Sequence, residues 1–285
     1  MRLRTQFASL EGSHPDVDPI PNTHIVTLDW TRFELDLLLP WTDSIDLELQ
    51  APYDIKNVHA KYQLPDGTPY DNPEGNLHHR TEKLEGVSDF RLYWNFNVDG
   101  WRLSAGVNLP VGRIEPNPYA LGALGLKHEH IQFGTGTCDP LARVSKVVHL
   151  MDGVDLSAAA GAQIPLVDNR KGYHAPVTAD FAIGPRVRIA DWLSAMASYS
   201  VLWQGRAYWD GDPDPNTGYV IQGFQLSVPI RLGSGILIAP NVYRAFDVTT
   251  RGGGDAFKLD WIAGLSIEIP LGGGPKSPVA EEHHH

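Results

Sequence analysis

The 285-residue chain lacks long apolar runs, has a single cysteine and carries fewer cations than anions. No stretch comes near the roughly 18 apolar residues that a membrane-spanning helix needs. The lone Cys138 excludes an intramolecular disulfide. A formal net charge of -11 argues against nucleic acid as a partner, because phosphate binding depends on clustered Lys and Arg.

In place of long runs, apolar side chains recur at every second position in many short segments. This period of two is the signature of a β-strand with one apolar and one polar face. We expect twelve strands, over residues 2–11, 24–39, 44–53, 87–97, 101–110, 140–150, 154–166, 176–189, 192–203, 219–231, 235–246 and 257–271. The first of these shows the weakest alternation.

Two of the expected strands depart from strict alternation. The apolar face of the second strand changes parity between Trp30 and Phe33, which predicts a β-bulge. The sixth strand places Lys146 on its apolar face.

The connections between the strands alternate regularly between short and long. Tight turns such as Val98-Asp99-Gly100 carry residues that tolerate positive φ, as hairpins require. Long polar connections, at 12–23, 54–86, 111–139, 167–175, 204–218 and 247–256, separate the hairpins. Outer-membrane barrels have this arrangement, with short periplasmic turns and long extracellular loops.

We therefore predict an all-β protein, a transmembrane antiparallel up-and-down β-barrel of about twelve strands in the bacterial outer membrane. Residues 1–271 form the barrel, and 272–285 form a tail with part of a purification tag. The start of the chain lacks the apolar core of a signal peptide, as in a mature form. The expected surroundings are membrane lipid or lipopolysaccharide. A soluble β-sandwich, which also alternates, is the alternative fold.

The side chains at the polar positions of the strands should face the lumen, and their charges predict two charged walls. The inward acidic residues, expected on one wall, are Glu34, Asp36, Asp46, Glu48 and Asp89. The inward basic residues, expected on the opposite wall, are Arg102, Arg143, Arg186, Arg188 and Arg231. Opposed walls would impose a transverse field on a permeating solute. The alternative is that these charges pair across a lumen too narrow to conduct.

Three segments together resemble a known family. They are Val87-Ser88-Asp89-Phe90-Arg91-Leu92, the run from Leu103 to Gly112, and Phe133-Gly134-Thr135-Gly136-Thr137-Cys138-Asp139-Pro140. In this order they resemble the outer-membrane transporter-like proteins named for the MetA pathway of phenol degradation. The resemblance implies a barrel that passes or binds small hydrophobic or aromatic compounds, and it carries over no catalytic residue.

The loop 111–139 contains an unusually apolar stretch, residues 119–126. An apolar segment in an external loop indicates that the loop folds over or into the barrel. We predict a lid or plug over the mouth of the lumen. The Gly-Thr-Gly-Thr segment of this loop lacks the lysine and helix of a phosphate-binding loop.

Signals for metals and catalysis are weak. Asp210, Asp212 and Asp214 alternate in one loop, but prolines and the absence of a bidentate glutamate break the calcium-binding pattern. His128 and His130 give a second weak metal signal. Ser145 and His149 lie about two strand repeats apart, too far for proton transfer. We predict a channel or transporter for a small molecule, without enzyme activity, cofactor or metal. A non-conducting barrel that acts structurally or through its outer loops is the alternative.

Overall fold

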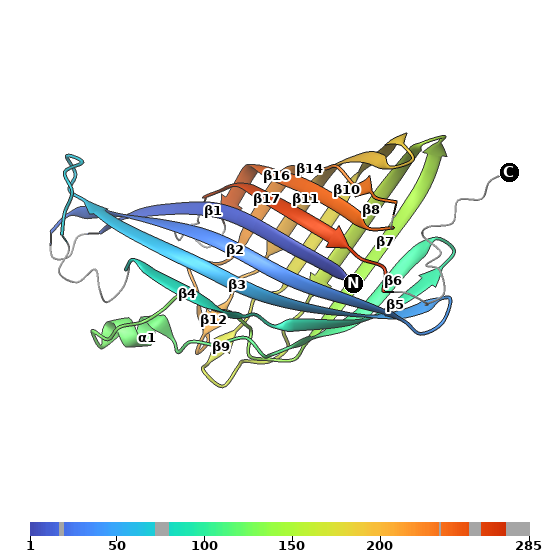
Figure 1. Ribbon diagram of the computed structural model, residues 1–285. Helices are drawn as coiled ribbons and strands as arrows, with labels where there is room; N and C mark the ends of the chain where they lie inside the picture. Colours follow the sequence, from blue (N-terminus) through green and yellow to red (C-terminus); the bar gives the residue numbers. More distant parts are fainter. Residues whose placement is uncertain (17–19, 72–79, 234, 251–257, 272–285) are drawn as a thin grey trace.

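The computed structural model describes residues 1–16, 20–71, 80–233, 235–250 and 258–271. They form a closed antiparallel barrel of twelve strands (Figure 1). Its members in chain order are β1 (Arg2–Asp16), β2 (Asn22–Pro40), β3 (Ile45–Gln63), β5 (Phe90–Val98), β6 (Trp101–Leu109), β7 (Asp139–Met151), β8 (Val154–Gln163), β10 (Thr178–Ala190), β11 (Leu193–Gln204), β14 (Tyr219–Ser227), β16 (Leu237–Thr250) and β17 (Lys258–Glu268). Pairing of β17 with β1 closes the ring. The predicted strands and fold class are confirmed.

Five short strands and one helix lie outside this set. The two-residue β15 (Ile230–Arg231) follows β14 after a break at Pro229. The strand β4 (Glu82–Val87) precedes β5, and the two pair with successive parts of β3. The strands β9 (Tyr173–His174), β12 (Tyr208–Trp209) and β13 (Asp212–Pro213) form a small separate sheet that joins two loops. Within the described part of the chain, α1 (Pro118–Ala123) is the one helix, and no helix there is long and apolar enough to cross a membrane.

The tight turns follow the chemistry that the sequence predicts. Asp99 and Gly100 have φ of 49° and 74°, and Gly153 has φ of 73°. These left-handed conformations fit the twist of a hairpin and are tolerated by Asp and Gly.

Large apolar side chains cover the outer wall of the barrel. Examples with more than a third of their surface exposed are Phe33, Trp94, Leu103, Phe181, Phe224 and Leu265. Their neighbours of opposite parity face the lumen, and many of them are polar and buried. An apolar exterior around a polar interior is the reverse of a soluble core, and it suits contact with hydrocarbon.

Strands β1, β2 and β3 run well beyond the rest of the barrel, and Figure 1 shows them extending far to one side. Residues 54–63 and 82–87 belong to strands, so much of the predicted loop 54–86 is sheet. β2 and β3 have 19 residues each, whereas a tilted membrane-spanning strand needs about 9–11. The surplus lies on the side of the long loops.

The bulge predicted in β2 between Trp30 and Phe33 is wrong. β2 pairs with both β1 and β3 in continuous register through this region. Even-numbered side chains face inward along the whole strand, but beyond the polar lumen they include the apolar Val26 and Leu28. There Val26 packs in a cluster with Val58, Leu84 and Phe133. The change of pattern therefore marks where the inner face stops lining a polar lumen and starts to pack against a loop.

Candidate substrate path and mouth of the barrel

The order of the strands fixes which walls face each other. From β2, the ring reaches β10 in six steps through β3, β5, β6, β7 and β8, and in six steps through β1, β17, β16, β14 and β11. Glu34 of β2 and Arg186 of β10 therefore lie on opposite walls.

The acidic wall contains its own cations, supplied by β1. Arg2 Nε donates to Asp36 Oδ2 at 2.6 Å, and Arg4 Nε lies 3.0 Å from the same carboxylate. Arg4 also pairs with Glu34. All of these carboxylates are buried. Much of the acidity predicted for this wall is therefore neutralised locally, by two arginines that weak alternation in the first strand concealed.

Arg102 lies with the acidic residues and not on the basic wall where the sequence analysis expects it. Its Nη2 and Nη1 atoms donate to the two oxygens of Asp46 at 2.8 and 3.0 Å. Asn95 of the intervening strand β5 donates to the same carboxylate at 2.7 Å. Arg102 Nη2 also lies 3.7 Å from Glu48. The long guanidinium side chain reaches across one strand, which a reading of parity alone does not anticipate.

The opposite side of the lumen holds arginines that are more exposed to solvent. Arg186 Nε lies 3.8 Å from Asp155, and 42% of the Arg186 side chain is exposed. Arg188 and Arg231 are exposed as well. Arg143, on β7 between the two walls, lies over the ring of Tyr93 at 4.3 Å. Solvent therefore reaches the inner wall along β10, whereas the wall along β1–β3 is packed.

Glycines on the inner wall lie beneath large side chains of neighbouring strands. A Cβ at Gly106 would be 2.6 Å from the ring of Tyr93, and one at Gly223 would be 2.4 Å from that of Tyr243. Gly161 is covered in the same way by the carboxylate of Asp180. Absence of a Cβ lets these side chains lie flat against the sheet, which leaves more of the bore open.

Above the acidic wall, Asp54 holds a buried polar cluster that the sequence analysis did not single out. Its carboxylate, 0% exposed, accepts bonds from Arg32 Nε and Nη2, both at 2.8 Å. It also accepts from Trp30 Nε1 at 2.8 Å and from the Ser88 hydroxyl. The cluster fastens β2, β3 and the break between β4 and β5 together.

Asp89, predicted as a lumen charge, anchors both ends of the loop between β6 and β7. It accepts from the backbone N–H groups of Gly112 at 2.9 Å and Thr135 at 2.7 Å, and from Asn108 Nδ2 at 2.7 Å. A Cβ at Gly134 would lie 2.2 Å from its Oδ1 atom, so only glycine fits there. The three segments that carry the family resemblance thus meet around this one carboxylate.

Loop 110–138 is held at two places. At one, Phe133 is buried against β2, β3 and β4. At the other, Asn117 Nδ2 donates to Asp210 at 2.8 Å and the Tyr119 hydroxyl donates to Asp214 at 2.7 Å. Those two aspartates lie in loop 205–218, which leaves β11, and β11 is six places from β3. Loop 110–138 therefore contacts, at the long-loop end of the barrel, elements that originate from opposite sides of the ring.

Lys56 lies beside Phe133. It is outside the membrane-spanning part of β3, because the outward side chains of this strand are polar after Ile55. Its ammonium is 4.3 Å from the centre of the Phe133 ring and donates to the Gln132 carbonyl at 2.9 Å. Burial lowers the pKa of Lys56 to about 8, although the nearby Asp54 carboxylate acts to raise it. An unfolded lysine titrates near ~10.4.

This difference predicts that the protein becomes more stable as the pH rises from about 8 to about 9.5, where the unfolded chain binds more protons than the folded one. Below about 8, both states are protonated at Lys56 and the full cost of burying the cation applies. Burial and the Asp214 carboxylate raise the pKa of Tyr119, so this phenol lowers stability only at higher pH, as the tyrosine of the unfolded chain titrates around ~10. Urea unfolding in detergent micelles across this range measures the effect. Lys56→Met should remove the pH dependence, and an equal slope in wild type and variant would contradict the assignment.

The weak metal signals gain no support from the described residues, among which no group of three potential ligands gathers. Asp214 accepts from the Asn216 N–H at 3.0 Å and from Tyr119, and Asp210 accepts from Asn117. His128 and His130 stack edge to face with ring centres 5.2 Å apart. His149 Nδ1 is 3.2 Å from Asp155.

The sequence of the chain matches no family model and no curated protein, so membership of the phenol-degradation family is not confirmed. Among solved structures it is similar to an outer-membrane channel from Pseudomonas putida F1, with 13% identity, coverage of 93% of this chain and 92% of that chain, and a TM-score of 0.62.

Two further structures are more distant. A Pseudomonas aeruginosa FadL homologue has 11% identity, coverage of 93% of this chain and 89% of that chain, and a TM-score of 0.46. The P. putida toluene transporter TodX has 9% identity, coverage of 93% and 88%, and a TM-score of 0.46. Scores below 0.5 carry no argument, so only the first likeness bears on the fold. The fold is that of a bacterial outer-membrane β-barrel.

Proposed function

We propose that the barrel is a passive channel that lets a small molecule cross the outer membrane. The observation that carries the proposal is the exposure of Arg186 within the lumen, 42% of its side chain, opposite a packed acidic wall. Solvent that reaches an inward side chain leaves room for a solute. The similarity to an outer-membrane channel supports the same function.

The selecting elements in this proposal are the lumen width, the charges and loop 110–138. The acidic side carries Glu34, Asp36, Asp46 and Glu48 together with Arg2, Arg4 and Arg102, so its net field is small. The opposite side carries Arg186, Arg188 and Arg231 against Asp155 and Asp180, and this surplus of positive charge acts on a solute. This asymmetry favours a solute with a partial or full negative charge. A small aromatic compound with a polar group fits both this lumen and the family resemblance.

Planar-bilayer recordings with the purified full chain test the proposal. We expect discrete conductance steps, and we expect replacement of both Arg186 and Arg188 by Gln to shift the reversal potential in a salt gradient toward cation permeability. Lys83→Gln, on an exposed residue of β4, is the matched control and should change nothing. Absence of steps in the wild type would overturn passive conduction.

A non-conducting barrel is the second candidate, and one observation favours it. Loop 110–138 is held at two places, through Phe133 and through Tyr119, as a lid would be. Under this proposal the barrel does not conduct, with or without the loop, and it acts structurally or through its outer loops. Conductance that stays absent after the loop is cleaved would support this second function.

A further inference from the structure

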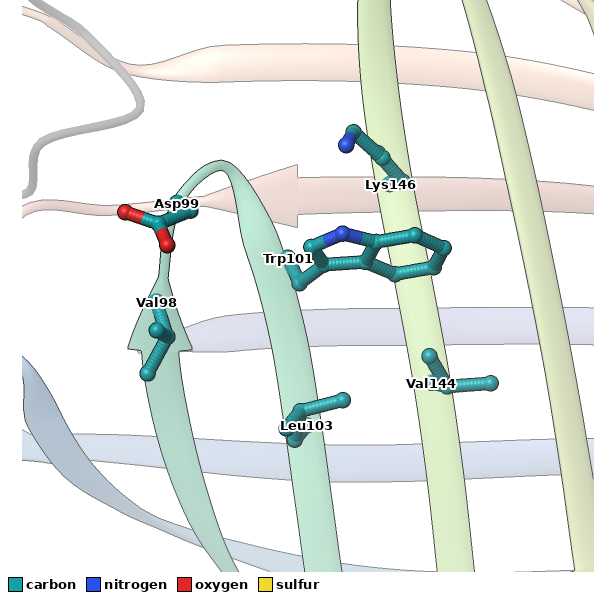
Figure 2. Close-up of a pocket in the computed structure, with 6 residues that line it drawn as sticks. All are labelled: Val98, Asp99, Trp101, Leu103, Val144 and Lys146. Atoms are coloured by element: carbon teal, nitrogen blue, oxygen red, sulfur yellow. The ribbon is translucent and has the colours of Figure 1, made fainter.

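A groove lies on the outer wall where the β5–β6 hairpin meets β7 (Figure 2). It has a volume of about 470 Å³. Its lining residues are Val98, Asp99, Trp101, Leu103, Val144 and Lys146. The groove faces away from the lumen, because Arg102, between Trp101 and Leu103, points inward to Asp46.

Lys146 is a cation on an apolar part of the outer wall. It pairs in register with Trp101, and its Nζ atom lies 4.5 Å from the centre of the indole ring (Figure 2). Val144 and Val148, which share its face, are apolar. No carboxylate among the described residues lies within ion-pair distance of it. A cation in this position needs an anion from the surroundings or access to the membrane interface.

The groove lies at the level of the membrane interface. Asp99 belongs to the tight turn between β5 and β6, and Trp101 begins the next strand. Tight turns mark the periplasmic end of such barrels, and a tryptophan there sits at the level of lipid headgroups. The ammonium of Lys146 and the carboxylate of Asp99 are therefore both at headgroup level, with Leu103 and Val144 extending toward the hydrocarbon.

We propose that this groove binds one phospholipid of the periplasmic leaflet with a primary-amine headgroup, of the phosphatidylethanolamine type. The lipid phosphate pairs with Lys146, and the headgroup ammonium donates hydrogen bonds to Asp99. One acyl chain lies along Leu103 and Val144. A trimethylammonium headgroup has no N–H to donate to Asp99, and a glycerol headgroup has no cation. The inference rests on the membrane placement and not on passage of a solute.

Lipid binding to the purified full chain, measured by native mass spectrometry from detergent with added lipid, tests the inference. We expect one phosphatidylethanolamine per chain, held more tightly than phosphatidylcholine or phosphatidylglycerol. One cation near a headgroup contributes about 1 kcal/mol, so Lys146→Gln should weaken binding about fivefold. Asp99→Asn, which retains a residue that tolerates positive φ, should remove the preference for the amine headgroup while leaving phosphate binding.

Arg244→Gln is the matched control. Arg244 is also an exposed cation, paired with Asp260 at 3.7 Å, and its loss should leave lipid binding unchanged. A heat-dependent gel shift verifies that every variant is folded. Equal affinity for the three lipids in the wild type would overturn the inference. So would full retention of binding in Lys146→Gln, or a groove occupied by a second copy of the chain, seen as a lipid-free dimer.

Discussion

Replacement of Asp54 by Asn is expected to lower the free energy of unfolding of the barrel by about 3–5 kcal/mol, the range for removing one member of a buried ion pair. The carboxylate is fully buried and neutralises Arg32 through two bonds of 2.8 Å. Asparagine preserves the size of the side chain but leaves the guanidinium without a counter-charge. It also offers a single acceptor where Trp30 and Arg32 now share the two carboxylate oxygens. Urea unfolding in lipid vesicles, with the gel shift as a second readout, measures the loss.

Asp180→Asn is the control for this prediction. Asp180 is an inward carboxylate on β10 that is exposed and has no ion pair within 4.0 Å among the described residues. Its neutralisation should change stability by no more than ~0.5 kcal/mol. If the two variants lose stability equally, the Asp54 cluster does not have the structural role assigned to it.

Replacement of Phe133 by Ala is expected to detach loop 110–138 from the inner face of β2, β3 and β4. Truncating a buried phenylalanine costs about 3–5 kcal/mol, and here the cost falls on the loop more than on the barrel. The ring fills the space between Val26, Val58 and Leu84, and Lys56 and Arg113 lie over it at 4.3 and 5.2 Å. Protease cleavage within 110–138 in intact membranes should accelerate, and the open-channel conductance should rise.

Phe133→Leu keeps an apolar side chain in the same space and should show a much smaller increase in cleavage. Two results would contradict the assignment of this residue as the anchor. One is an unchanged cleavage rate in Phe133→Ala. The other is rapid cleavage with unaltered conductance, which would show that the loop does not obstruct the path.

Alternation predicts the barrel because it follows directly from the two environments of the wall. Trp94 must face hydrocarbon and Asn95 must not, and no knowledge of distant contacts is needed to see it. The turn at Asp99-Gly100 can likewise be recognised from adjacent residues alone. Strand number, turn positions and the outward place of Lys146 were therefore accessible from the sequence.

The site was less accessible because it depends on register between strands. Arg2 meets Asp36 only because β1 and β2 pair in the register that the structure shows. Arg102 reaches Asp46 across a strand, and Phe133 meets Val58 across 75 positions of chain. The pairing of Arg4 with Glu34 could have been proposed from a hairpin register, had the first strand been treated as charged on its inward face.

The interior of β2 shows a second limit. A change from polar to apolar at constant parity can mean a bulge or a change of surroundings, and one sequence does not distinguish the two. Here the surroundings change, since Val26 faces a packed loop while Glu34 faces the lumen.

The long strands β2 and β3 have a consequence for the exterior of the cell. At about 3.3 Å per residue, 19 residues span roughly 60 Å, so the sheet rises well above the lipid headgroups on one flank. Its outward face there carries Asn57, His59 and Lys61, which can bond to hydroxyl and phosphate groups. The raised flank therefore places a polar wall beside the entrance on that side of the barrel.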